Sequence, residues 1–147
     1  KKGQIMDLGG REIGEHHGAV YYTLGQRKGL GIGGVKNAGE DPWFVVGKDV
    51  AKNIIFAAQG ADNPALLERQ LYTAGVSWIS GEAPKFPFDC SAKIRYRQAD
   101  QVCTVSESMN NELKVTFRDE QRSITPGQSV VFYTEDQCLG GGIISRT

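Results

Sequence analysis

The sequence lacks an apolar run long enough to cross a bilayer as a helix, and it shows no secretory pattern. Lys1 and Lys2 lead into polar residues where a signal peptide would have an apolar core. Cysteine is scarce: Cys90, Cys103 and Cys138 are the only three, and their spacing fits no zinc motif. We therefore expect a cytoplasmic protein without a membrane or metal partner, whose thiols are reduced and unpaired.

An excess of charge of one sign is also missing. The 17 Lys and Arg residues balance the 17 Asp and Glu residues, which excludes a strongly basic nucleic-acid-binding domain. The distribution is uneven, however. Residues 1–39 hold six basic residues against three acidic ones, and residues 85–97 hold four against one. Local basic patches on a neutral chain are therefore expected.

A glycine-rich stretch, residues 25–34, carries one amide and two adjacent cations, Gln26, Arg27 and Lys28. Glycine lets a backbone come close to a partner. The three side chains offer hydrogen-bond donors that suit a phosphate or the edge of a base. The alternative is a surface loop whose cations are merely solvated.

The same stretch matches one nucleotide-binding motif in spacing only. Residues 29–34 have the G-x-G-x-x-G pattern of dinucleotide-binding folds, which requires a strand before it and a helix after it. Polar residues precede the pattern, and the turn-like residues 35–42 follow it, so we interpret the match as accidental. No Gly-Lys-Ser or Gly-Lys-Thr of a P-loop occurs in the chain.

Short β-rich runs separated by turn residues predict a mainly β fold. In a first domain, residues 1–68, we expect one hairpin that joins residues 3–8 to residues 11–16. A second hairpin is expected from residues 43–47 and 54–58. Residues 19–24 fit a helical turn or a short strand equally well, and one short helix is expected to follow in residues 64–70, at the end of this domain.

In a second domain, residues 69–147, five to six short strands with turns about every ten residues predict a small closed or nearly closed β-barrel of the six-stranded type. Alternation over residues 90–97 places Lys93, Arg95 and Arg97 in one outward row. The same alternation sends Tyr96 inward.

Three further runs complete the expected barrel. Residues 112–118 alternate, which predicts that Leu113, Val115 and Phe117 point inward. Residues 129–133 are apolar and are expected to be buried on both faces. The three glycines at residues 140–142 indicate a bulge or a sharp bend in the last strand.

Four strings of mixed residue types resemble the bacterial tRNA-specific 2-thiouridylases. They are His16-x-Gly18 with Tyr22-Thr23-x-Gly25-Gln26-Arg27-x-Gly29-Leu30-Gly31; Arg95-Tyr96-Arg97-Gln98; Thr125-Pro126-Gly127-Gln128-Ser129-Val130-Val131-Phe132-Tyr133; and Cys138-Leu139-Gly140-Gly141-Gly142-Ile143-Ile144. The resemblance implies a small central domain followed by a C-terminal barrel, similar to the second domain of the translation elongation factors.

The resemblance also implies a tRNA partner and no DNA partner. In the family, the residues that correspond to Arg95, Tyr96 and Gln128 contact tRNA. The properties of the side chains and the matched strings extend this set of expected tRNA-binding residues to Arg97, Gln98, Gln26, Arg27, Lys28 and His16.

The activity implied for the intact family enzyme is ATP-dependent replacement of the 2-oxygen of the wobble uridine by sulfur. Sulfur arrives as a persulfide from a carrier protein and passes through two catalytic cysteines. The family's Ser-Gly-Gly-x-Asp-Ser phosphate loop is not in this sequence, and the three cysteines do not fall in the catalytic motifs. We therefore expect the C-terminal portion of such an enzyme, with no catalytic residue and no activity of its own.

Two other hypotheses stay open. One is a purely structural or protein-interaction barrel of a translation-related protein, whose basic residues only aid solubility. The other is a nucleotide-binding enzyme that uses the glycine-rich stretch. Binding of tRNA that weakens with salt would favour the 2-thiouridylase hypothesis, because phosphate contacts release counterions.

Overall fold

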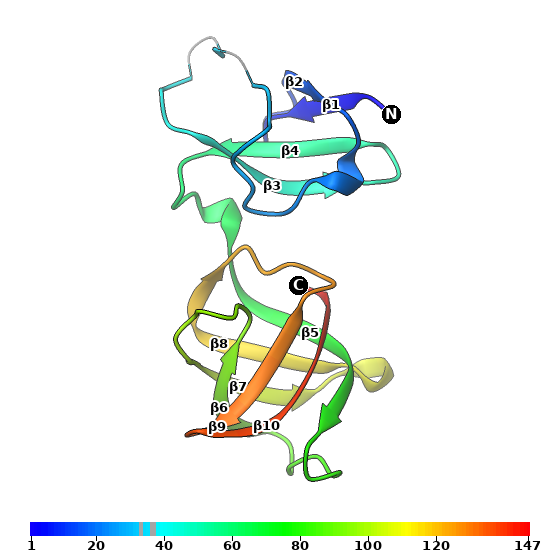
Figure 1. The fold of residues 1–147 in the computed structure, drawn as a ribbon, viewed down its shortest axis with the longest axis vertical. Helices are drawn as coiled ribbons and strands as arrows, with labels where there is room; N and C mark the ends of the chain where they lie inside the picture. The colour runs from blue at the N-terminus through cyan, green and yellow to red at the C-terminus, as the bar shows by residue number, and fades with distance from the viewer. Residues whose placement is uncertain (33, 36–37) are drawn as a thin grey trace. The chain divides into compact units, whose positions relative to one another are not determined.

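The computed structural model describes residues 1–32, 34–35 and 38–147. The chain forms two compact units (Figure 1), here called the sheet unit, Lys1–Leu67, and the barrel unit, Glu68–Thr147. Each unit has its own hydrophobic core.

The sheet unit is built on a four-stranded sheet with the order β2-β1-β4-β3. Its strands are β1 (Gly3–Met6), β2 (Glu12–His16), β3 (Trp43–Asp49) and β4 (Ile54–Gln59). The pairs β1–β2 and β3–β4 are antiparallel, which confirms the two expected hairpins, and β1 runs parallel to β4. A short 3-10 helix, η1 (Ala19–Tyr21), lies in the connection between β2 and β3.

One face of this sheet is buried by branched side chains. Ile5, Val45 and Ile55 are fully buried, and Leu30 of the glycine-rich stretch packs into the same cluster. Burying one such side chain contributes about 1.5–3 kcal/mol. The glycine-rich stretch is therefore anchored to the sheet through an apolar side chain in its middle.

The barrel unit is a closed barrel with the strand order β10-β5-β8-β7-β6-β9. Its strands are β5 (Leu67–Trp78), β6 (Phe88–Lys93), β7 (Gln101–Glu107), β8 (Leu113–Arg122), β9 (Ser129–Thr134) and β10 (Gln137–Arg146). The 3-10 helix η2 (Pro64–Leu66) precedes β5, and η3 (Met109–Asn111) forms the turn between β7 and β8. The expected six-stranded barrel is confirmed.

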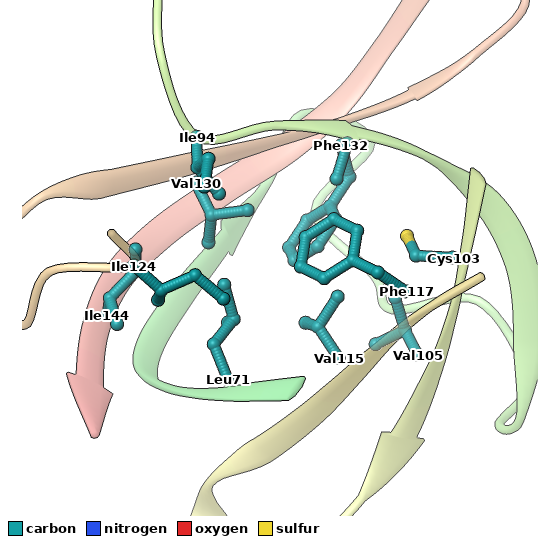
Figure 2. Packing of buried hydrophobic residues seen from close by; sticks show 11 residues of the cluster. Leu71, Ile94, Cys103, Val105, Val115, Phe117, Ile124, Val130, Phe132 and Ile144 are labelled. Carbon is teal, nitrogen blue, oxygen red and sulfur yellow. The ribbon is translucent and has the colours of Figure 1, made fainter. Parts of the chain in front are cut away.

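Alternating side chains fill the barrel interior. Val115 and Phe117 of β8 point inward, as the alternation predicts, and meet Phe132 of β9 in a common cluster (Figure 2). Leu71 and Ile144 bring the first and last barrel strands into the same core.

The last strand carries the expected bulges. The pairing of β10 shifts register next to Gly140 and again between Gly141 and Ile143. A Cβ atom at Gly140 would collide with the backbone carbonyl oxygen of Ser77. Glycine is therefore required where β10 crosses β5 and the barrel closes.

Three expectations about single elements are wrong. The helix expected at residues 64–70 is only the single turn η2, because β5 already begins at Leu67. The run 129–133 is not buried on both faces: β9 alternates between buried and half-exposed residues, because only one face of a barrel strand meets the core. The strand expected at residues 90–97 ends at Lys93.

No helix in the part of the chain that the structure describes is long and apolar enough to cross a membrane.

Candidate nucleic-acid interface

The connection between β6 and β7 carries four of the nine residues expected to contact RNA, namely Arg95, Tyr96, Arg97 and Gln98. After Lys93 the chain leaves the sheet and makes a tight turn, in which the Gln98 N–H donates to the Arg95 carbonyl oxygen at 3.2 Å. The Ile94 N–H donates to Oε1 of Gln98 at 3.0 Å. A side-chain oxygen thus accepts the hydrogen bond that a carbonyl oxygen of a neighbouring strand would accept within a sheet. The turn lifts Tyr96 away from the barrel.

Tyr96 is the most exposed large apolar residue that the structure describes, with 93% of its surface accessible. The alternation predicts that Tyr96 points inward, and this prediction is wrong because β6 ends three residues earlier, at Lys93. For the same reason, Arg95 and Arg97 do not form a row with Lys93 on one strand face. Exposed aromatic rings offer a surface on which a nucleic-acid base can stack.

A chain of three glutamine amides supports this turn. Nε2 of Gln98 donates to Oε1 of Gln121 at 2.7 Å, and Nε2 of Gln121 donates to Oε1 of Gln101 at 3.0 Å. Gln121 is only 3% exposed. The amide of Gln98 is therefore used within the protein at both ends, which suits a positioning role better than an RNA contact.

Arg95 is also partly engaged by the protein. Its Nη2 donates to the backbone carbonyl oxygens of Arg122 and Ser123, the latter at 3.0 Å. Partial burial, and then the nearby charge of Arg122, lowers the pKa of Arg95 below its usual value. Both bonds come from Nη2, so Nε and Nη1 are left with donors for a further partner.

A groove of about 320 Å³ lies beside the turn, between β6 and β9. It is lined by Lys93, Ile94, Arg95, Tyr96, Ser129, Val131 and Tyr133. Nζ of Lys93 lies 5.5 Å from the ring centroid of Tyr133 and 3.5 Å from Oδ1 of Asp100. The groove thus combines two tyrosines with two cations.

Two other expected contacts lie close to this groove in the sequence. Gln128 is exposed on the turn just before β9 and directly precedes Ser129, which lines the groove. Arg97 is exposed on the same turn as Tyr96, and among the described residues it makes no ion pair.

Several residues of this site are outside the sequence-based set. Tyr133 and Ser129 line the groove through the pairing of β6 with β9, and Gln121 and Gln101 hold the turn through bonds between distant segments. Tyr133 belongs to one of the strings that resemble the 2-thiouridylases, and this membership was the one sequence feature that could have marked it as a site residue. No sequence feature marked Gln121 as a site residue.

The glycine-rich stretch of the sheet unit follows the edge of β3. The Gly25 N–H donates to the Val45 carbonyl oxygen at 2.8 Å, and the Val45 N–H donates to the Gln26 carbonyl oxygen at 2.9 Å. The Gln26 amide is closed within the loop, because Oε1 accepts from the Thr23 N–H and Nε2 donates to the Lys28 carbonyl oxygen. Arg27 and Lys28 are exposed.

The structure also bears on the nucleotide-binding hypothesis. Gly33, Lys36 and Asn37 of the expected loop and turn lie outside the described residues. After Gly34, the next regular element among the residues described is β3, not a helix. A nucleotide phosphate would therefore find no helix N-terminus after these glycines, so this stretch does not fit the ATP that the family implies.

His16 is placed inside the sheet unit and is only 1% exposed. Its Nδ1 accepts from the Gly18 N–H at 2.9 Å, and its Nε2 lies 2.9 Å from the Asn53 carbonyl oxygen. Both nitrogens are thus paired in the neutral form that carries its proton on Nε2. We correct the expected set here: His16 has no accessible edge for RNA.

With this geometry in place, comparison with known proteins gives a consistent result. Residues 68–144 match the family described as Aminomethyltransferase beta-barrel domain, and residues 1–59 match the family described as tRNA methyl transferase PRC-barrel domain. The chain is 54% identical over 144 residues to the tRNA-specific 2-thiouridylase MnmA of Francisella philomiragia subsp. philomiragia. The corresponding protein of Francisella tularensis subsp. novicida is 53% identical over 144 residues. The chain belongs to the tRNA-specific 2-thiouridylase family.

The match to these 2-thiouridylases covers 98% of the chain but only 40% of each of the two relatives. The expected resemblance is therefore confirmed, and it extends over both units. Among the residues described, no group of three or more His, Cys, Asp or Glu side chains is placed to hold a metal ion.

Proposed function

We propose that this chain is the tRNA-docking portion of a tRNA 2-thiouridylase. In the intact enzyme, the wobble uridine would exchange its 2-oxygen for sulfur in an ATP-dependent reaction. The observation that carries the proposal is the groove of the barrel unit, where a turn presents Tyr96 almost fully exposed beside Arg95 and Arg97. The relatives are tRNA-specific enzymes by name, which supports tRNA as the RNA.

The groove offers two kinds of interaction to an RNA strand. Tyr96 provides a ring on which an unpaired base can stack, worth about 1–3 kcal/mol per base. Arg97 and the free edge of Arg95 neutralise phosphates, and the exposed amide of Gln128 reaches a sugar, a phosphate or a base edge.

The sheet unit supplies a second set of contacts in this proposal. Arg27 and Lys28 are exposed on the glycine-rich stretch and are suited to phosphates. Gln26 holds the loop that displays them, since both ends of its amide are bonded within the loop. The proposed domains are residues 1–68 and 69–147, each with its own RNA-binding segment.

Catalysis belongs to other parts of the enzyme. ATP, a persulfide donor and a sulfur-carrier protein would all act on a portion that contains the phosphate loop and the catalytic cysteines. This chain alone is proposed to be inactive toward ATP, and the enzyme is proposed to work in the cytoplasm.

A binding experiment tests the proposal. The purified chain is titrated into fluorescently labelled tRNA, with heparin as a polyanion that is not RNA and with ATP as a separate ligand. We expect saturable tRNA binding that outcompetes heparin and weakens with salt, with a log–log slope of about −0.7 to −0.9 per phosphate contact. Equal affinity for heparin and tRNA, or no binding of either, would favour the structural or protein-interaction barrel instead.

A further inference from the structure

Two of the three cysteines face each other across neighbouring barrel strands. Cys90 of β6 is paired directly with Cys103 of β7 in an antiparallel ladder, and their Sγ atoms lie 3.7 Å apart. Both are free thiols in the structure. Residues that are directly opposite in such a ladder have Cα atoms about 4.5–5.5 Å apart, which lies inside the range that disulfides span.

The two thiols differ in environment. Cys103 is 2% exposed and belongs to the barrel core, whereas Cys90 is half-buried at the edge of that core (Figure 2 shows Cys103). The two thiols share a hydrogen bond, which lowers the pKa of Cys90. The same bond, and then burial, raises the pKa of Cys103. An oxidant therefore meets Cys90 first, and the second thiol lies next to it.

We propose that Cys90 and Cys103 form a redox-active dithiol that closes to an intramolecular disulfide when the chain meets a peroxide. The proposal does not depend on the RNA-binding function of the groove. In the absence of an oxidant both cysteines stay reduced, as expected for a cytoplasmic protein.

The chemistry balances in two steps. The Cys90 thiolate attacks one oxygen of hydrogen peroxide, the O–O bond breaks, and the products are a sulfenic acid on Cys90 and hydroxide, which takes up the thiol proton to become water. The sulfur of Cys103 then attacks the sulfur of Cys90, an S–S bond forms and the S–O bond breaks. The leaving hydroxide takes the Cys103 proton, so two thiols and one peroxide give one disulfide and two water molecules.

The position of the pair gives the disulfide a local effect. Cys90 and Cys103 enclose the end of β6, the start of β7 and the connection between them, which carries Arg95 and Tyr96. A bridge at this point would close a covalent loop around the turn and restrict the conformations open to it.

The test treats the whole chain with hydrogen peroxide at low protein concentration and maps the product by peptide mass spectrometry without reduction. We expect a product lighter by two hydrogen atoms, whose peptides link Cys90 to Cys103 and separate again with dithiothreitol. The variant Cys138→Ser should form the same bridge at an unchanged rate, and Cys90→Ser and Cys103→Ser should not form it.

Controls keep folding and chemistry apart. Circular dichroism checks each variant, and if Cys103→Ser does not fold, the map of the wild-type and Cys138→Ser products still decides the question. In urea the selectivity for the Cys90–Cys103 bridge should fall, because the ladder that aligns the two thiols is lost. Oxidation that stops at a sulfinic acid on Cys90, or that yields bridges to Cys138 in the folded chain, would overturn the proposal.

Discussion

At the scale of single residues, hydrogen bonding divides the expected RNA contacts into two groups. Tyr96, Arg97 and Gln128 are exposed and free to meet a ligand, whereas the amides of Gln98 and Gln26 are spent on bonds within the protein. A side chain in the first group can be removed without loss of internal contacts. Substitution in the second group changes the loop that displays the first.

Removal of the Tyr96 ring should weaken tRNA binding without weakening the fold. We expect Tyr96→Ala to cost about 1–3 kcal/mol of binding free energy, through the loss of one stacked base, and Tyr96→Phe to retain most of the affinity. Fluorescence anisotropy with labelled tRNA measures both. Met109→Ala is the matched control, since Met109 is also exposed on the barrel, at 77%. Equal effects of Tyr96→Ala and Met109→Ala would remove Tyr96 from the interface.

Substitution of Arg97 and of Arg95 should distinguish a residue that only contacts phosphate from one that also stabilises the fold. Arg97→Ala is expected to reduce the salt slope of tRNA binding by about one unit and to leave the melting temperature unchanged. Arg95→Ala should also lower the melting temperature, because two backbone carbonyls lose a charged donor; with Arg95 partly exposed, the cost is about 1 kcal/mol. The readouts are salt titrations and thermal denaturation. A stable Arg95→Ala chain with unchanged affinity would show that Arg95 serves neither role.

At the scale of elements, the sequence predicts the strands well and the end of β6 poorly. Alternation correctly places Val115 and Phe117 inward, and the glycines mark the bulges of β10, because both signals are local. The end of β6 is decided by Gln98, whose side chain bonds to the Ile94 N–H and to Gln121, 23 residues further along. A hydrogen bond between segments that far apart leaves no periodic trace in the sequence. The groove was therefore predictable only in part, through the matched strings.

The glutamine chain should couple the fold to RNA binding. Gln121→Ala would leave the Gln98 amide without its acceptor and open space in a buried site, so we expect a loss of about 2–3 kcal/mol of unfolding free energy. At a temperature where the variant is folded, tRNA affinity should also fall, because the turn that carries Tyr96 loses its support. Urea denaturation and anisotropy measure the two effects. Gln137→Ala, an exposed change in the same barrel, should alter neither. A destabilised Gln121→Ala chain that keeps full affinity would mean that the turn holds its shape without Gln121.

At the scale of the whole molecule, a net charge of zero coexists with basic segments in both units. Arg27 belongs to the sheet unit and Arg97 to the barrel unit, and both side chains are exposed. If one tRNA binds both units, the affinity is the result of contacts on two surfaces, one on the sheet unit and one on the barrel unit. Salt should then weaken binding more steeply than either surface alone would require.

The two surfaces should act independently. We expect Arg27→Ala and Arg97→Ala each to weaken tRNA binding, and the double variant to show the sum of the two free-energy changes to within about 0.5 kcal/mol. Binding isotherms of the four chains give the result. A double variant no weaker than one of the single variants would show that only one of the units meets the RNA.

The pairing of β5 with β10 has a consequence for synthesis on the ribosome. During synthesis, β5 leaves the exit tunnel long before β10, the strand with which it pairs to close the barrel. The core contact between Leu71 of β5 and Ile144 of β10 therefore forms only after β10 has emerged. Until then the nascent chain exposes the unpaired edges of β5 and β9, which are open to wrong pairing with other chains. Long-range closure of this kind is intrinsically slow. A stalled or truncated chain that lacks β10 would therefore be a substrate for chaperones and proteases, even with every other strand in place.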